Sequence, residues 1–283
     1  MVYVSTACLK GKTWFEKDFY KVLETYVKAG IKDIELGSCH GYFSDLKKLF
    51  KMQKDNGLNF IVHTFFPPLK DQLWVNIASQ NQKVLKASLG VATNAMDLCR
   101  KIDAPLYTIH PGYTVEFKGE DDLVKNSDEV PYSKAFSTFL ESIQKLADKA
   151  STQGLKLGVE TQYNKMGYML LSRAEEFEEL FSKVTNKNLG ILFDTGHVYS
   201  NGANIGVDVP DFINRVKEKV IAFHLHDPNK SGNFEDNHQK IKSLDFFKDF
   251  DKGFFKDKFL TLEVTKLNIN EILQQKKFLD QLE

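Results

Sequence analysis

Histidine, aspartate and glutamate residues recur along this chain at the ends of short apolar runs, and these residue types bind divalent metal ions in proteins. The densest stretch is 223–238, FHLHDPNKSGNFEDNH, which holds three of the seven histidines and three acidic residues. Six residues of this kind end six different runs, and they are His63, His110, Glu160, Asp194, His224 and Glu263. Any one of them alone is most simply a hydrogen-bonded loop residue. Six gathered in one place would be costly to bury without a cation, so the set predicts a metal site.

The apolar runs have the length and composition of β-strands, and longer segments with helical spacing of apolar residues lie between them. Eight runs are found, at 3–7, 33–37, 59–65, 106–110, 156–161, 189–195, 220–226 and 259–264. The clearest helical segments are 15–30, 81–102, 132–154, 173–184 and 209–220. This alternation predicts a parallel α/β sheet, and eight repeats predict its closure into a (β/α)8 TIM barrel. A doubly wound open sheet is the structural alternative.

A closed barrel would bring the six residues together, because the carboxyl ends of its strands converge on one face, where barrel enzymes build their active sites. Each of the six stands at or just beyond the end of its run. No Pro-rich or Gly/Ser-rich linker divides the chain, so we expect a single domain over residues 1–283.

Two further pairs extend the candidate metal ligands. His197 follows Asp194 by three residues in FDTGHVY, and Asp236 and His238 are separated by one residue in EDNH, so that in an extended loop both side chains point the same way. Taken alone, an Asp-x-His loop is more often simply solvated. Imidazole with carboxylate and no thiolate is the ligand chemistry of Zn, Mn, Fe or Co, and Mg fits so many histidines less well.

Composition narrows the class of protein. The formal net charge is zero, so the overall balance predicts no attraction to nucleic acid or to an acidic membrane. The start of the chain, MVYVSTACLKGK, indicates neither secretion nor membrane insertion, and no apolar run is long enough to span a bilayer. Cys8, Cys39 and Cys99 are widely separated, which argues against a disulfide framework and fits a reducing cytoplasm.

Taken in order, the motifs IELG, VHTFFPP, NIAS, TIHPGY, GVETQ, FDTGHVY, HLHD, DNH and LTLEV resemble those of the xylose-isomerase-like TIM-barrel superfamily over essentially the whole chain. That superfamily includes sugar isomerases and epimerases and also the endonuclease IV type of abasic-site DNA-repair enzyme (AP endonuclease family 2).

The resemblance implies specific roles for the metal-ligand candidates. In the epimerase-like members one metal would be held by Glu160, Asp194, His224 and Glu263. The endonuclease IV-like members hold three zinc ions. There His63 and His110 would bind the first ion, Glu160 would bridge to a second ion on the epimerase-like ligands, and His197, Asp236 and His238 would bind the third. We therefore expect one to three divalent ions per chain, Zn or Mn first.

Two enzymatic hypotheses follow. The first is a metal-dependent isomerase or epimerase acting on a small sugar or sugar-phosphate-like substrate, in which Glu160 and Glu263 act as general base and acid around an enediolate. The second is an endonuclease IV-like zinc phosphodiesterase acting on abasic-site DNA or another phosphoester. Two features favour the sugar. Only Arg100, Arg173 and Arg215 occur, and the segment 113–132 after the fourth strand is rich in acid. A metal-binding or sugar-binding barrel without turnover is the non-catalytic alternative.

Four further residues are predicted to contact the substrate, and they are His226, Tyr113, Lys266 and His40. His226 follows His224 by two, so it points the same way along the strand and higher toward solvent. For all four, ordinary surface or loop residence is the competing interpretation. Phe65 and Phe66 are candidates for an apolar wall of the pocket, with core packing as the alternative.

Overall fold

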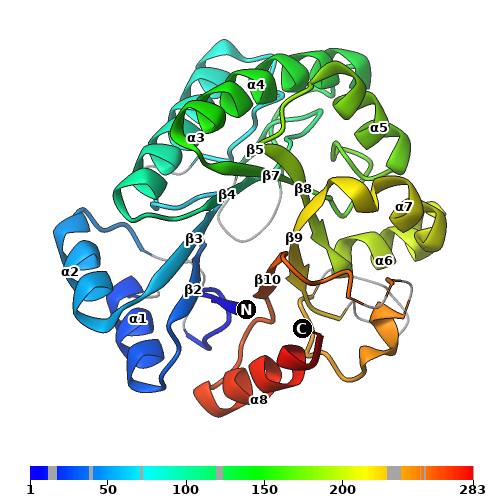
Figure 1. Ribbon diagram of the computed structural model, residues 1–283. Coiled ribbons are helices and arrows are strands. Elements are labelled where there is room, and N and C mark those ends of the chain that lie inside the picture. Colours follow the sequence, from blue (N-terminus) through cyan, green and yellow to red (C-terminus); the bar gives the residue numbers. More distant parts are fainter. Residues whose placement is uncertain are drawn as a thin grey trace.

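Eight parallel strands close into a barrel in the computed structural model, which describes residues 1–11, 18–37, 41–70, 73–118, 124–227, 237–248, 250–251 and 253–282 (Figure 1). The strands, in chain order, are β1 (Val2–Ser5), β2 (Asp33–Leu36), β3 (Asn59–His63), β4 (Leu106–Ile109), β7 (Lys156–Glu160), β8 (Leu189–Asp194), β9 (Val220–Leu225) and β10 (Phe259–Leu262). β1 pairs with β10 on one side and β2 on the other, so the sheet has no edge. The predicted (β/α)8 barrel is confirmed, and the open sheet is wrong.

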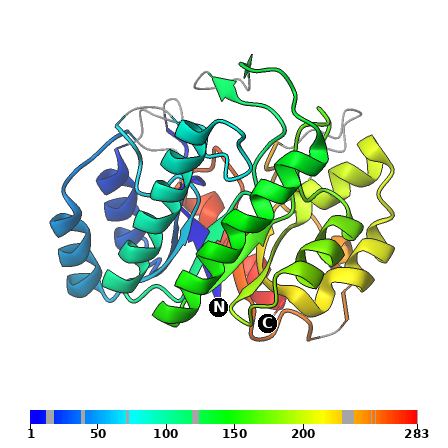
Figure 2. The same ribbon diagram turned by 90° about the horizontal axis from the view of Figure 1, so that it is seen from above.

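Helices surround the barrel (Figures 1 and 2). They are α1 (Phe19–Lys28), α2 (Leu46–Asn56), α3 (Gln82–Lys101), α4 (Tyr132–Gln153), α5 (Ala174–Lys183), α6 (Thr195–Ile205), α7 (Val209–Val216) and α8 (Ile269–Leu279). Short 3-10 turns lie at η1 (Lys217–Lys219), η2 (Leu244–Phe247) and η3 (Asp280–Leu282). A small hairpin of β5 (Phe117–Lys118) and β6 (Val124–Lys125) projects from the end of the barrel opposite to the chain termini (Figure 2).

Local sequence explains several helix ends. Asp18, Asn81 and Asp208 accept hydrogen bonds from backbone amides in the first turns of α1, α3 and α7, which satisfies donors that a helix start leaves unpaired. Gly57 and Gly154 end α2 and α4 in the left-handed conformation that glycine adopts without strain. These signals fix where each helix begins or ends relative to the neighbouring strand.

The side chains inside the barrel form two layers, an apolar one and, next to it toward the carboxyl ends of the strands, a polar one. Tyr3, Ile61, Leu106, Leu192 and Ala222 form a separate buried cluster inside the barrel. Successive strand residues alternate between faces, so the residues two positions further on point into the barrel as well. Those residues include His63, Thr108, Asp194 and His224, and all of them are buried. The apolar layer therefore supports a polar layer at the carboxyl ends of the strands.

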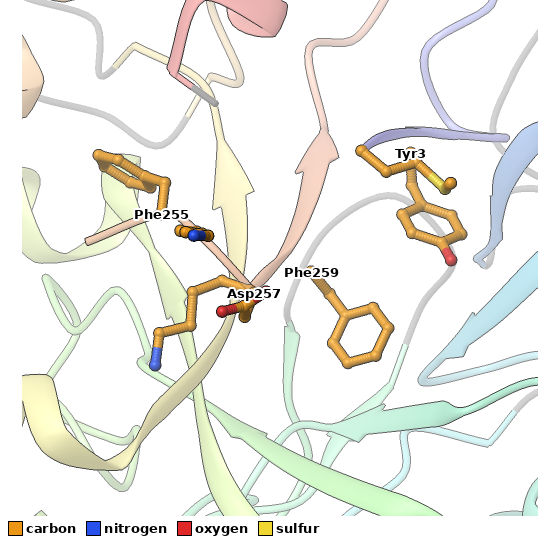
Figure 3. A pocket seen from close by; sticks show the side chains of 7 residues that line it. Tyr3, Phe255, Asp257 and Phe259 are labelled. Carbon is orange, nitrogen blue, oxygen red and sulfur yellow. The ribbon is translucent and has the colours of Figure 1, made fainter. Parts of the chain in front are cut away.

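A hollow of about 410 Å³ opens at the other end of the barrel, where β1 and β10 begin, and Tyr3, Phe255, Asp257 and Phe259 line it (Figure 3). The apolar layer separates this hollow from the polar layer. None of the described helices is long and apolar enough to cross a membrane.

Candidate metal centre

Glu160 lies at the middle of the polar layer and is 1% exposed. Its two carboxylate oxygens face different partners. Oε2 lies 2.8 Å from Nε2 of His110 and 3.7 Å from Nε2 of His63. Oε1 lies 3.5 Å from Nδ1 of His224 and 3.6 Å from Nδ1 of His197. A carboxylate shared in this way would be able to offer one oxygen to each of two neighbouring groups of ligand-type residues.

Further carboxylates surround the same nitrogen of His224. Oε2 of Glu263 lies 2.7 Å from Nδ1 of His224, and Oδ2 of Asp194 lies 3.8 Å from it. β8 and β9 lie between β7 and β10 in the barrel, so Asp194 and His224 stand between the two glutamates. One ligand atom from each of these four residues lies within 4.8 Å of the others, as do the ligand atoms of His63, His110 and Glu160.

The donor set fits a divalent cation better than internal hydrogen bonding. Oε2 of Glu160, Nδ1 of His224 and Oε2 of Glu263 are buried, yet none of them has a hydrogen-bond partner among the described residues. Their short separations gather ligand-type atoms around one position, in geometries that form no aligned hydrogen bond. Buried polar groups are normally paired, so a convergent unpaired set indicates a group that the protein itself does not supply. Imidazole and carboxylate suit Zn or Mn.

The charges in this layer strongly perturb one another in the metal-free protein. Burial raises the pKa of Glu263, but His224 and His238 outweigh burial and lower it to about 2. Burial lowers the pKa of His224, but Glu263 and Glu35 raise it well above its usual value. For His63 burial dominates and lowers the pKa to about 4, although Glu160 opposes that shift. The layer therefore combines ionised carboxylates with at least one neutral imidazole.

A second group of ligand-type atoms lies beside the first. Nitrogens of His197, His226 and His238 lie within 4.8 Å of one another, and the rings of His226 and His238 stack with centroids 4.2 Å apart. His197 lies in the first turn of α6. Asp194 caps this helix, because its Oδ1 accepts a hydrogen bond from the backbone N–H of His197 at 2.7 Å. This cap starts a helix directly at the end of β8, so His197 lies on a helix and not in a loop.

His226 differs from its predicted position, because it is fully buried and does not point toward solvent. Its Nε2 lies 2.9 Å from Oδ1 of Asp194. The ring packs directly over Gly196, where a Cβ atom would lie 1.9 Å from Cε1 of His226. The glycine in FDTGHVY thus makes room for His226 beside the candidate ligands.

Four other residues were predicted to belong to the site, and the structure describes two of them. Asp236 and His40 lie outside the described residues. Tyr113 is buried against Phe117, and both burial and the nearby Glu160 carboxylate raise its pKa. Lys266 is exposed in the turn after β10. Whether Tyr113 and Lys266 contact a substrate stays a prediction.

The two phenylalanines that were predicted to form an apolar wall of the pocket lie in different parts of the structure. Phe66 is fully buried and packs against Phe19 in the outer core. Phe65 is half-buried, and its ring lies edge-on to His110 with centroids 5.6 Å apart. Trp74 lies next to Phe65 in a second edge-on contact. Phe65 is therefore the member of the pair that borders the metal-ligand candidates.

Glu35 was not predicted as a site residue. It lies on β2, is 1% exposed, and its Oε2 is 2.9 Å from Nε2 of His224. The sequence signal for it was an acidic residue between the apolar residues Ile34 and Leu36. The spacing along the chain contained no hint of the contact, because 189 residues separate the pair.

Comparison with known proteins places the chain in a family. The family model described as xylose isomerase-like TIM barrel matches residues 23–276, so the chain belongs to this family. Two sequence relatives are an uncharacterized protein of Methanocaldococcus jannaschii, 27% identical over 202 residues, and a probable endonuclease 4 of Sulfurihydrogenibium, 23% identical over 155 residues. The matches cover 70% and 55% of this chain, but only 60% and 50% of those relatives.

Several solved structures have a fold similar to that of this chain. A D-tagatose 3-epimerase-like protein has a TM-score of 0.73 at 21% identity, covering 99% of this chain and 96% of its own. A D-psicose 3-epimerase has a TM-score of 0.71 at 16% identity, covering 99% and 98%. A barrel protein of Mycobacterium smegmatis, solved in complex with magnesium, has a TM-score of 0.68 at 11% identity, covering 99% and 95%. These structures establish the shared fold.

Proposed function

We propose that this protein is a divalent-metal-dependent isomerase or epimerase acting on a small sugar or sugar-phosphate-like substrate, with Zn or Mn as the ion. The observation that carries the proposal is the placement of Glu160 and Glu263 on two sides of Nδ1 of His224, at 3.5 and 2.7 Å. Two carboxylates that flank one ion position are arranged to exchange protons with a carbon atom of a substrate bound between them.

The proton chemistry follows from the charges of these side chains. Glu263, with a pKa lowered to about 2, is ionised at neutral pH and can accept a proton from a carbon next to a carbonyl group, and the protonated Glu263 can then return a proton to carbon. Glu160 is ionised as well, since His110, His224 and His63 hold its pKa well below the usual value against the effect of burial. A divalent ion held by Glu160, Asp194, His224 and Glu263 would polarise the substrate's carbonyl and stabilise negative charge on its oxygens.

The surroundings favour a small substrate over duplex DNA. DNA binding depends on neutralising phosphates with Lys and Arg. All three arginines of the chain are described, and none contacts the candidate ligands. Arg215 pairs with Glu175 and Glu178 on the surface, Arg173 donates to the carbonyl of Ile205, and Arg100 lies in the last turn of α3. The zero net charge and buried thiols at Cys8 and Cys99 fit a cytoplasmic enzyme of small-molecule metabolism.

A phosphoester hydrolase of endonuclease IV type is the second candidate. The specific observation in its favour is the bridging geometry of Glu160, which connects the pair His63 and His110 to His224. Adjacent cations activate a water molecule and stabilise the leaving oxygen of a phosphoester. Several sequence relatives named probable endonuclease 4 point the same way. Two or three ions per chain would favour this alternative.

One experiment separates the two. Metal-loaded protein is incubated with a panel of ketoses and their phosphates in heavy water, and separately with a duplex carrying one abasic site. Deuterium incorporation at carbon without strand cleavage is the expected result. Strand cleavage without deuterium incorporation would replace the sugar proposal with the hydrolytic one.

Variants sharpen this experiment. Glu263→Gln removes a base and should abolish exchange. Glu141→Gln, on the exposed face of α4, is the matched control and should leave it unchanged. Exchange that survives Glu263→Gln would remove Glu263 from the mechanism.

A further inference from the structure

Glu35 is a buried carboxylate that the proposed chemistry does not use. It lies on β2 between the apolar residues Ile34 and Leu36 and points into the barrel. Its Oε2 lies 2.9 Å from Nε2 of His224 and accepts a hydrogen bond from Oγ1 of Thr261 at 3.2 Å. Burying a carboxylate costs free energy unless charged or polar partners offset it. Thr261 is a neutral partner, so the imidazole of His224 is the partner that bears on the function.

The two nitrogens of His224 have different surroundings. Nε2 faces Glu35, whereas Nδ1 faces the carboxylates of Glu263, Glu160 and Asp194 at 2.7 to 3.8 Å. Nδ1 has no hydrogen-bond partner among the described residues. Histidine binds a metal ion as the neutral imidazole, which donates from one nitrogen and presents a lone pair at the other. The contact with Glu35 therefore decides which nitrogen of His224 is offered to an ion.

The position of Glu35 in the barrel supports this separation of roles. β9, which carries His224, pairs with β8 and β10, whereas β2 pairs with β1 and β3. Glu35 thus approaches the imidazole from across the barrel interior, and Thr261 on β10 fixes its orientation. The outer nitrogen of a metal-bound histidine is commonly held by a carboxylate, which fixes the ring and raises its basicity.

We propose that Glu35 is a positioning residue for the metal centre: it holds Nε2–H of His224 and directs Nδ1 toward an ion shared with Glu160, Asp194 and Glu263. This inference rests on the metal dependence in the proposed function. It does not depend on whether the substrate is a sugar or a phosphoester. Glu35 belongs to none of the groups of converging ligand atoms among the described residues, so it would act through His224.

The test measures metal binding directly. Purified protein is stripped with a chelator, and the dissociation constants for Zn²⁺ and Co²⁺ are measured by competition with a chromophoric chelator. The visible absorption of the Co²⁺ form reports the ligand geometry. Glu35→Ala should weaken binding about 10- to 100-fold and change the Co²⁺ spectrum, as is usual when the partner of a ligand histidine is removed.

Two further variants isolate the cause. Glu35→Gln retains an acceptor for Nε2–H but removes the charge, so it should restore much of the Co²⁺ spectrum and lose affinity by less than Glu35→Ala. Asp33→Asn is the matched control, because Asp33 lies on the same strand but bonds to Asn59 at the surface. It should bind both metals as the wild type does.

The outcomes distinguish the inference from the proposed function. Wild-type affinity and spectrum in both Glu35 variants would overturn the positioning role and leave the proposed function standing. If Glu35→Ala does not fold, Glu35→Leu fills the same space without an acceptor, and wild-type metal binding in that variant overturns the role equally. If the Glu35 variants bind metal more weakly but the wild-type protein turns over no sugar, the positioning role is supported and the sugar proposal is wrong. A wild-type protein that binds no divalent ion would overturn both.

Discussion

Oε2 of Glu160 lies 2.8 Å from Nε2 of His110, while the other oxygen of the same carboxylate points toward His224. One side chain thus belongs to two groups of ligands. Replacing Glu160 by Gln keeps the shape but removes the charge that both groups share. We expect the metal content per chain to fall and turnover to drop by about 10²- to 10⁴-fold, the usual contribution of a positioned acid or base.

The measurement for this prediction is elemental analysis together with initial rates. Glu141→Gln again serves as the control on an exposed helix face. Unchanged metal content in Glu160→Gln would show that Glu160 is not a ligand, and its catalytic role would then have to be argued separately.

Gly196 leaves the space that His226 occupies. A methyl group at this position would lie 1.9 Å from Cε1 and 2.4 Å from Nδ1 of the imidazole. Gly196→Ala should therefore displace His226, lower the free energy of unfolding by about 1–3 kcal/mol and reduce metal content. Urea denaturation and elemental analysis measure these effects.

Gly90→Ala is the matched comparison for that substitution. Gly90 lies within α3, and an added Cβ meets nothing within 4 Å. Because alanine is the better helix former, this variant should gain about 0.5–1 kcal/mol. Equal stability changes in the two glycine variants would contradict the packing argument at Gly196.

His226 is placed to be a ligand as well as a substrate contact, since it lies with His197 and His238 and is fully buried. We expect His226→Asn to lower the number of ions per chain when the wild type binds more than one. A rise in KM with unchanged metal content would favour the substrate contact. Lys266→Ala, at an exposed position, provides a comparison that should leave metal content as it is.

His63 makes the metal-free protein sensitive to acid. Its folded pKa is about 4 and its ordinary value is 6.5, so between these values the unfolded chain binds a proton that the folded chain refuses. The contribution of His63 to stability should therefore be fully present above pH 6.5 and be lost as the pH drops toward 4, by about 3 kcal/mol. Glu263, with its folded pKa near 2, adds a loss of the same sign only below about pH 4.5.

This prediction is checked by urea denaturation at pH 6.5 and 4.5 of protein whose metal has been removed with a chelator. His63→Gln should flatten the dependence over that interval. The same slope in the variant would assign the acid sensitivity to other groups.

Sequence periodicity was sufficient to predict the barrel and much of its polar layer. Apolar residues such as Ile61 and Ala222 precede His63 and His224 by two positions, and a strand alternates faces with a period of two. The ligand-type residues therefore had to share the face of the apolar residues before them. Their chemistry predicted a metal centre because imidazole and carboxylate in one buried layer need a cation or one another.

Tertiary structure alone decided the relations between strands that are distant in sequence. The sequence DIEL does not reveal whether Glu35 faces water or the barrel interior, and only closure of the barrel brings Glu35 to Nε2 of His224. His226 likewise shares a face with His224 by spacing, but the close approach of α6 at Gly196 buries it beside Asp194. A sequence specifies spacing along one strand, whereas contacts across the barrel depend on how the whole sheet closes and which helix covers its end.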